Sequence, residues 1–294
     1  MIRVFPRRTS HTPKDRRAFV GDPPLFRPKG EEVHISVAFT WDLPEAERLK
    51  KAWSSLYPTV KIGGPALGNE TGVNFVPGRY IKEGVTFTTR GCDRKCPWCL
   101  VPQREGRLVE IADYPPGWII QDNNFLQGSK EHQAGVFQML RGLEKNPAFK
   151  ATRGVEFAGG IDCRLVTPWF AEQLETIRLY QVFLAADTEG SIRQLERARH
   201  TLSNLTRHKL RVYTLIGYGK DTIPKAIKRL ERVWNLGCIP HAQLYQPDNN
   251  WIKYSREWRL LARTFSRPAA IYAYMQAGKI AQDITPLPMG RLWD

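Results

Sequence analysis

Residues 84–99 read GVTFTTRGCDRKCPWC, and this stretch decides how the rest of the chain is interpreted. Its first half has the β-branched and aromatic composition of a strand, and a glycine turn follows. Cys92, Cys96 and Cys99 come next, with C-x3-C-x2-C spacing. This order places three thiols on a loop at the carboxyl end of a strand, where α/β enzymes keep their sites.

Three cysteines supply one ligand fewer than a closed metal site needs. Structural zinc sites and most iron–sulfur sites are filled by four protein ligands, so a trio leaves one coordination position open for a substrate or cofactor. Two other interpretations stay open at this stage. The trio could form a structural zinc knot completed by a histidine or by Cys163, or it could be three reduced cysteines that happen to lie close together.

The stretch resembles the cluster loop of the radical S-adenosylmethionine (SAM) superfamily, which prefers an aromatic residue before its third cysteine, as Trp98 is here. The resemblance implies that Cys92, Cys96 and Cys99 hold a [4Fe–4S] cluster whose fourth iron is chelated by SAM. It further implies reductive cleavage of SAM to a 5′-deoxyadenosyl radical that takes a hydrogen atom from an unknown substrate. A flavodoxin- or ferredoxin-type protein would supply the electron. The resemblance extends to phage-associated members of the superfamily, which makes nucleic-acid chemistry attractive.

From about residue 84 onward, strand patterns alternate with helix patterns. The predicted strands are Val85–Thr89, Trp118–Gln121, Gly154–Ala158, Gln181–Ala186, Leu210–Ile216 and Ile239–Tyr245, and the predicted helices lie near 130–145, 168–179, 190–203, 221–236 and 255–265. Such alternation predicts an α/β fold with a parallel sheet and right-handed crossovers. The first crossover is short and rich in proline, which predicts a stunted helix. By resemblance, six strands match the partial (β/α)6 TIM-type barrel of radical SAM enzymes, over residues 81–265.

Three further segments are predicted around this barrel. Residues 1–30 are basic, rich in Pro and Arg and without periodicity, so we expect a mobile or surface-draped arm. Residues 31–80 read as a small βαβ unit that resembles a truncated cobalamin-binding domain. The D-x-H-x-x-G cobalamin signature is absent from it, so we expect a cofactor-free remnant. Residues 266–294 are expected to form a C-terminal extension packed on the barrel.

Polar residues follow most of the predicted strands, as expected for the mouth of a parallel barrel. The radical SAM resemblance assigns roles to some of them. Asp122 or Asn123 would bind the SAM amino group, and Asp162 with Arg164 would meet the methionyl carboxylate. Asp187 stands where the family places a ribose-binding residue, and the turn at Gly217 would lie near adenine. The alternative to these SAM-binding roles is structural, because an aspartate that follows a strand often caps the next helix.

The composition of the chain indicates its compartment and the kind of partner that its charge would suit. Five cysteines, three of them clustered, argue against a disulfide framework and for a reducing, cytoplasmic compartment. No apolar run approaches the ~18 residues of a membrane span. The net charge is +15, and residues 1–30 and 207–232 each hold eight Lys or Arg against two acidic residues. Such a balance suits nucleic acid, and solvated helix faces are the alternative explanation. The alternative function is therefore a zinc-stabilised nucleic-acid-binding protein without catalysis.

Overall fold

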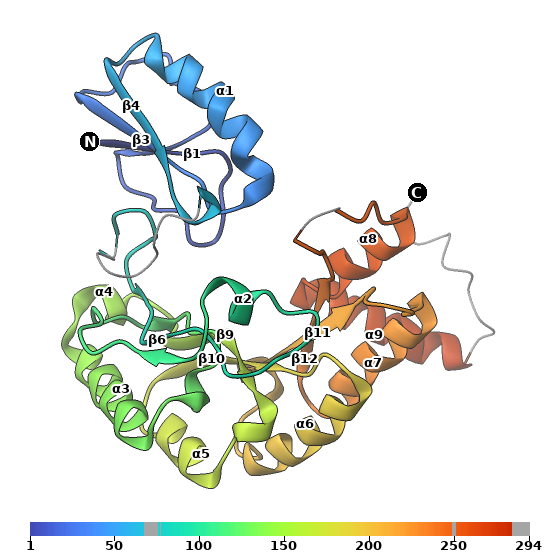
Figure 1. Ribbon diagram of the computed structural model, residues 1–294. Helices are drawn as coiled ribbons and strands as arrows, with labels where there is room; N and C mark the ends of the chain where they lie inside the picture. The colour runs from blue at the N-terminus through green and yellow to red at the C-terminus, as the bar shows by residue number, and fades with distance from the viewer. Residues whose placement is uncertain (68–75, 77, 249–250, 284–294) are drawn as a thin grey trace. The chain divides into compact units, whose positions relative to one another are not determined.

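The computed structural model describes residues 1–67, 76, 78–248 and 251–283 (Figure 1). The chain divides into two compact units. One comprises Met1–Phe87 with Asp113–Ile119, and the other Thr88–Ala112 with Ile120–Asp294. No helix in the described part of the chain combines the length and apolar character needed to cross a membrane.

The first unit contains a four-stranded sheet in the order β2-β1-β3-β4. Its strands are β1 (Ile2–Phe5), β2 (Ala18–Val20), β3 (Glu32–Ser36) and β4 (Thr59–Gly63), and every pair is parallel. Helix α1 (Leu43–Ser54) begins with a proline in its first turn and packs against β3 and β4. Since β3, α1 and β4 follow one another, the βαβ prediction for residues 31–80 is confirmed for these three elements.

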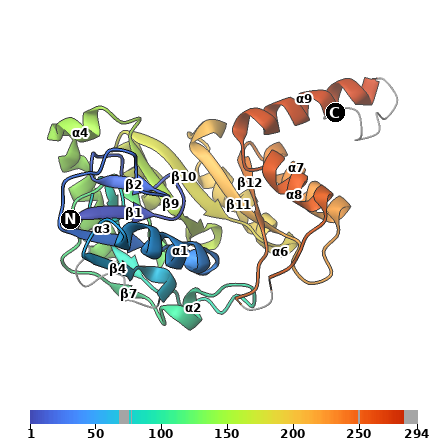
Figure 2. The ribbon, with the colours of Figure 1, turned by 90° about the horizontal axis from the view of Figure 1, so that it is seen from above.

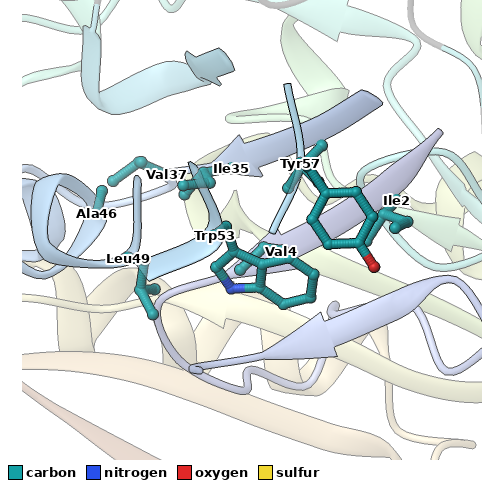
Figure 3. Close-up of a cluster of buried hydrophobic side chains, with 9 residues drawn as sticks. Ile2, Val4, Ile35, Val37, Ala46, Leu49, Trp53 and Tyr57 are labelled. Carbon is teal, nitrogen blue, oxygen red and sulfur yellow. The ribbon is translucent and has the colours of Figure 1, made fainter. Parts of the chain in front are cut away.

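The prediction of an arm over residues 1–30 is wrong. β1 is a central strand, and both Ile2 and Val4 are fully buried in the core of this sheet, beside Ile35 and Trp53 (Figure 3). The strand escaped detection because it is four residues long and carries a charge at Arg3. That guanidinium is satisfied within the fold, since Nη1 donates to the carbonyl oxygens of residues 78 and 79 over 2.7 and 2.6 Å.

A six-stranded sheet in the order β12-β11-β10-β9-β8-β5 forms the framework of the larger unit. Its strands are β5 (Val85–Thr86), β8 (Ile119–Ile120), β9 (Val155–Asp162), β10 (Leu179–Ala185), β11 (Leu210–Ile216) and β12 (Ile239–Leu244). The pairs β9–β10, β10–β11 and β11–β12 are parallel, which confirms an α/β fold. The boundary between the two units falls within β8, and β5 is assigned to the first unit.

Helices connect the parallel strands and lie along the outside of the sheet (Figure 1). They are α3 (Lys130–Gly142), α4 (Pro147–Lys150), α5 (Pro168–Glu175), α6 (Glu189–Thr201) and α7 (Ile223–Asn235), followed by α8 (Arg256–Thr264) and α9 (Pro268–Asp283). Every predicted helix has a counterpart among them. The short helix expected in the first crossover is α2 (Val101–Arg104). Ile271 of α9 packs into the same core as Leu261 of α8, while 284–294 lie outside the described residues.

Two strand predictions differ from the structure. The strand expected at 85–89 is split, because β6 (Thr89–Arg90) leaves the main sheet and pairs antiparallel with β7 (Val109–Glu110). Strand β9 continues through Asp162, so Asp162 is the last residue of the strand, whereas Arg164 follows the strand as expected. A register shift in the β9–β10 pairing, between Val182 and Leu184, lets β9 continue past Gly159 and Gly160.

Candidate functional site

The cysteine loop occupies residues 91–108, between β6 and β7. Gly91 has a φ of 73°, and a Cβ at this position would lie 2.0 Å from the carbonyl oxygen of Arg107. Only glycine fits such an approach. The backbone N–H of Cys92 donates to the carbonyl oxygen of Gly106 over 3.2 Å, so the two ends of the loop are held together.

Glu105 anchors the base of this loop. Its carboxylate accepts hydrogen bonds from Arg90 Nη2 at 2.8 Å, from the backbone N–H of Gly91 at 3.1 Å and from Asn123 Nδ2 at 2.5 Å. Asn123 follows β8, so Glu105 ties the entrance of the loop to the end of a neighbouring strand. The sequence gives no signal for Glu105, because its partners are separated from it by 14 to 18 residues.

The three thiols of the loop are free and partly exposed. Burial raises the pKa of Cys96, and the neighbouring charges of Cys99, Asp187 and Cys92 raise it further. Burial likewise raises the pKa of Cys99, with contributions from Cys92 and Asp187. The three sulfur atoms are therefore within electrostatic range of one another, and their thiolate forms need a compensating positive charge.

The donor set is compatible with an iron–sulfur cluster, because thiolates are the ligands that such clusters prefer. Within the described ranges, no group of three or more His, Cys, Asp or Glu side chains is arranged to coordinate a metal ion. Cys163 and Cys238 are buried, and burial raises the pKa of each to about 12. Cys163 Sγ donates to the carbonyl oxygen of Ser191 over 3.5 Å, which gives it a structural partner.

Trp98, between the second and third cysteines, contacts the end of β10. Its indole Nε1 donates to Asp187 Oδ2 over 3.2 Å, and its ring meets Tyr218 edge-on at 5.5 Å between centroids. Burial raises the pKa of Asp187, while the hydrogen bond from Trp98 opposes this shift. The contact brings two predicted site residues together, 89 positions apart in the chain.

Asp162 and Arg164, which the resemblance assigns to the methionyl carboxylate of SAM, form an ion pair with each other. Arg164 Nε and Nη2 donate to the two oxygens of Asp162 over 2.8 and 2.9 Å, and Arg94 of the cysteine loop donates to Oδ2 over 2.8 Å. Burial opposes ionisation of Asp162, but the hydrogen bonds from Arg164 outweigh it and lower its pKa. Arg94 was not singled out from the sequence, where it is one of many surface-type arginines.

Asp122 faces the backbone of the chain before the cysteine loop. It is 2% exposed, and it accepts hydrogen bonds from the N–H of Thr88 at 2.6 Å and from Thr88 Oγ1 at 2.5 Å. Burial raises its pKa against these hydrogen bonds. The Asp122 carboxylate therefore binds Thr88, in the segment that leads into the loop. The side chain of Asn123 instead donates to Glu105.

A cavity of about 240 Å³ opens at the carboxyl ends of β10 and β11. Its walls include Asp187, Thr188, Leu215, Tyr218, Lys220 and Asp221. Thr188 begins α6 with a capping box, in which its hydroxyl accepts from Ser191 N. The cavity therefore combines a carboxylate, a lysine and an aromatic ring at the edge of a parallel sheet where ligands bind.

The turn at Gly217 borders this cavity and is held from two sides. Its N–H donates to Asp221 Oδ2 over 2.9 Å, and its carbonyl oxygen accepts from Tyr254 Oη at 3.1 Å. Tyr254 Oη also donates to the carbonyl oxygen of Tyr245 over 2.8 Å. A Cβ on Gly217 would lie 2.9 Å from the Tyr254 ring. Asp221 also pairs with the buried Arg229, so its role is structural. It is not the N-cap of α7, because that position is Thr222 and no side chain caps the helix there.

No protein-family model matches the chain, and no curated protein matches it either.

Proposed function

We propose that this protein is a radical SAM enzyme whose six-stranded sheet is a partial (β/α)6 barrel. One observation carries the proposal. The C-x3-C-x2-C loop reaches, through Trp98 and Asp187, the rim of a cavity at the carboxyl ends of β10 and β11. A three-thiol loop linked to such a cavity supports this proposal, because an open-coordinated cluster needs three thiolates and adjacent space for its SAM ligand.

Cys92, Cys96 and Cys99 would hold a [4Fe–4S] cluster. When bound, the cluster supplies the electron that cleaves SAM reductively, and the protein's tasks are positioning and exclusion of water. Burial and mutual repulsion raise the pKa values of Cys96 and Cys99, so cluster loading must displace protons from these thiols. Arg94 and Arg164, both paired with Asp162, place positive charge beside the loop.

The remaining residues divide the task of holding SAM. Asp187 would accept from the ribose hydroxyls, and the Gly217 turn, held by Tyr254, would line the adenine. Asn123 suits the amino group better than Asp122, since the carboxylate of Asp122 is already taken by Thr88. The Asp162–Arg164 pair would face the methionyl carboxylate, with Arg164 the half-exposed member.

Anaerobic purification tests the proposal. We expect a brown protein with about four iron and four sulfide per chain, a broad band near 400 nm, and 5′-deoxyadenosine formation from SAM under dithionite. Cys96→Ala should lose iron and SAM cleavage together. The matched control is Cys238→Ala, a cysteine outside the loop, which should retain both. One zinc per chain without iron would contradict the proposal and favour the zinc-stabilised alternative.

A further inference from the structure

Helix α8 has two chemically opposite faces. Helix α8 packs against α7, β12 and α9 (Figure 2). Leu261 of α8 and Phe265, which directly follows the helix, are buried in the core that these elements share. Arg256, Arg259 and Arg263 are spaced three and four residues apart and are all exposed. This spacing places them on one stripe, with about 5 Å of helix rise between successive side chains.

These cations lack the partners that neutralise other arginines of the protein. In the described ranges, Arg256, Arg259, Arg263 and the neighbouring Lys253 form no ion pair with another side chain. The basic stretches noted in the sequence are different, because several of their charges are matched. Arg3 pairs with Asp15, Arg7 with Asp42, Arg229 with Asp221 and Arg232 with Glu196.

The arginine stripe continues into a second cavity, of about 290 Å³. It is lined by Leu244, Gln246, Ile252, Lys253, Tyr254 and Arg259. Both ends of the Gln246 amide bond Ile252, since Nε2 donates to the carbonyl oxygen of Ile252 over 3.0 Å and Oε1 accepts from Ile252 N at 2.8 Å. The rest of the lining is apolar and aromatic, from Leu244, Ile252 and Tyr254. Lys253 and Arg259 add two cationic groups at the rim.

Two large apolar side chains are exposed at Ile252, which lines this cavity, and at Trp251, which precedes it in the chain. Trp251 is 48% exposed and Ile252 39% exposed. Unpaired cations in a row bind a phosphate backbone, whereas an exposed indole and an aromatic-walled cavity suit an unstacked base. A duplex offers only its backbone to such a surface, because its bases are paired and stacked.

We propose that the α8 surface, defined as Lys253, Arg256, Arg259 and Arg263 with Trp251 and the adjoining cavity, binds single-stranded nucleic acid. The phosphates lie along the arginine stripe, and a base enters the cavity between Ile252 and Tyr254. The inference concerns binding alone, so it goes beyond the proposed cluster chemistry and can fail separately from it.

Fluorescence anisotropy of the full-length protein with a labelled 20-nucleotide single strand tests the proposal across a salt series. Arg256→Gln/Arg259→Gln/Arg263→Gln removes three phosphate contacts. At 0.15 M salt it should weaken binding roughly 50-fold, and it should lower the salt slope by about 2, at 0.7 per contact. The matched control Arg193→Gln/Arg197→Gln/Lys228→Gln removes the same charge from exposed positions of α6 and α7, and it should keep the wild-type affinity.

A second variant guards against misfolding of the triple mutant. Lys253→Gln alone should weaken binding about fourfold by the same arithmetic. Equal losses in both triple variants, or a duplex that binds as tightly as the single strand, would overturn the assignment. So would binding of phosphatidylglycerol vesicles without binding of the oligonucleotide. Cys96→Ala should bind the oligonucleotide as the wild type does, which separates this outcome from any failure of SAM cleavage.

Discussion

Trp98 Nε1 donates a hydrogen bond to Asp187 Oδ2 over 3.2 Å, and this contact joins the cysteine loop to the end of β10. It fixes the orientation of a carboxylate whose pKa burial raises, at the wall of the 240 Å³ cavity. A hydrogen bond to an ionised carboxylate contributes more free energy than one between two uncharged groups, because the acceptor bears a negative charge.

Trp98→Phe keeps the aromatic volume of the loop but removes this donor. On the proposed function we expect SAM to bind about tenfold more weakly, which corresponds to about 1.4 kcal/mol. Isothermal titration of the cluster-loaded protein with SAM measures the effect. Trp234→Phe, on α7, is the control and should bind SAM normally. Unchanged affinity in Trp98→Phe would show that Asp187 does not contact the ligand.

Gly91→Ala should disorganise the cysteine loop. A methyl group cannot occupy a position 2.0 Å from the Arg107 carbonyl oxygen, so the loop must open. We expect loss of iron retention, measured by iron content after anaerobic reconstitution. Gly106→Ala is a matched control, because its φ is 78° and nothing lies within 4 Å of the added carbon. That variant bears only the cost of left-handed backbone, about 1–3 kcal/mol, and should retain iron. Equal iron content in both variants would argue against the observed loop geometry.

Loss of the buried Arg229–Asp221 ion pair should strongly lower the free energy of unfolding. Arg229→Met leaves the Asp221 carboxylate without its cation and removes the donor to the Leu215 carbonyl oxygen. We expect a loss of about 3–5 kcal/mol in the free energy of unfolding, measured by urea denaturation. Arg232→Met removes a more exposed pair with Glu196 and should cost less than about 1 kcal/mol. Similar losses in the two variants would mean that burial is not the deciding factor.

His241 should make the protein less stable at mildly acidic pH. Burial and the adjacent Arg211 lower its pKa to about 4, and Arg211 Nη2 donates to His241 Nδ1 over 2.8 Å. The unfolded chain therefore binds a proton below pH 6.5 that the folded chain does not, so stability falls as the pH is lowered from about 6.5 to about 4. The loss should reach about 3 kcal/mol.

The measurement for His241 is urea unfolding at pH 7.5 and at pH 4.5. His241→Asn should remove most of this pH dependence, whereas His200→Asn, at an exposed position of α6, should preserve it. If His241→Asn retains the wild-type dependence, other groups account for the acid sensitivity.

Ile2→Ala tests the assignment of the N-terminal residues to a sheet. Ile2 is fully buried in β1, so truncation should lower the free energy of unfolding of the first unit by about 2–5 kcal/mol. Leu25→Ala is the control. Leu25 is 93% exposed, and its truncation should change stability by less than about 0.5 kcal/mol. A mobile arm would instead tolerate both substitutions equally.

The strands and helices of the larger unit were largely predictable because their signals are local. β11 matches its predicted bounds, and all of its residues except the half-buried Tyr213 are buried. β1 was not predictable in this way, since four residues give too short a pattern and its partners lie in β2 and β3. Within the site, the cysteine spacing was visible in the sequence, while the carboxylate of Glu105 was not.

The sequence by itself determined the thiol spacing, the alternation of strands and helices, and the excess of positive charge, because each is a property of neighbouring residues or of composition. Only the tertiary structure decided where these features meet. Among the residues that the structure describes, it left the arginines of α8 without an ion pair. It directed Asp122 to Thr88, brought Trp98 to Asp187, and paired several charges of the two basic stretches. Such partners come from elements far apart in the chain, and side-chain pairing depends on distance in space rather than in sequence.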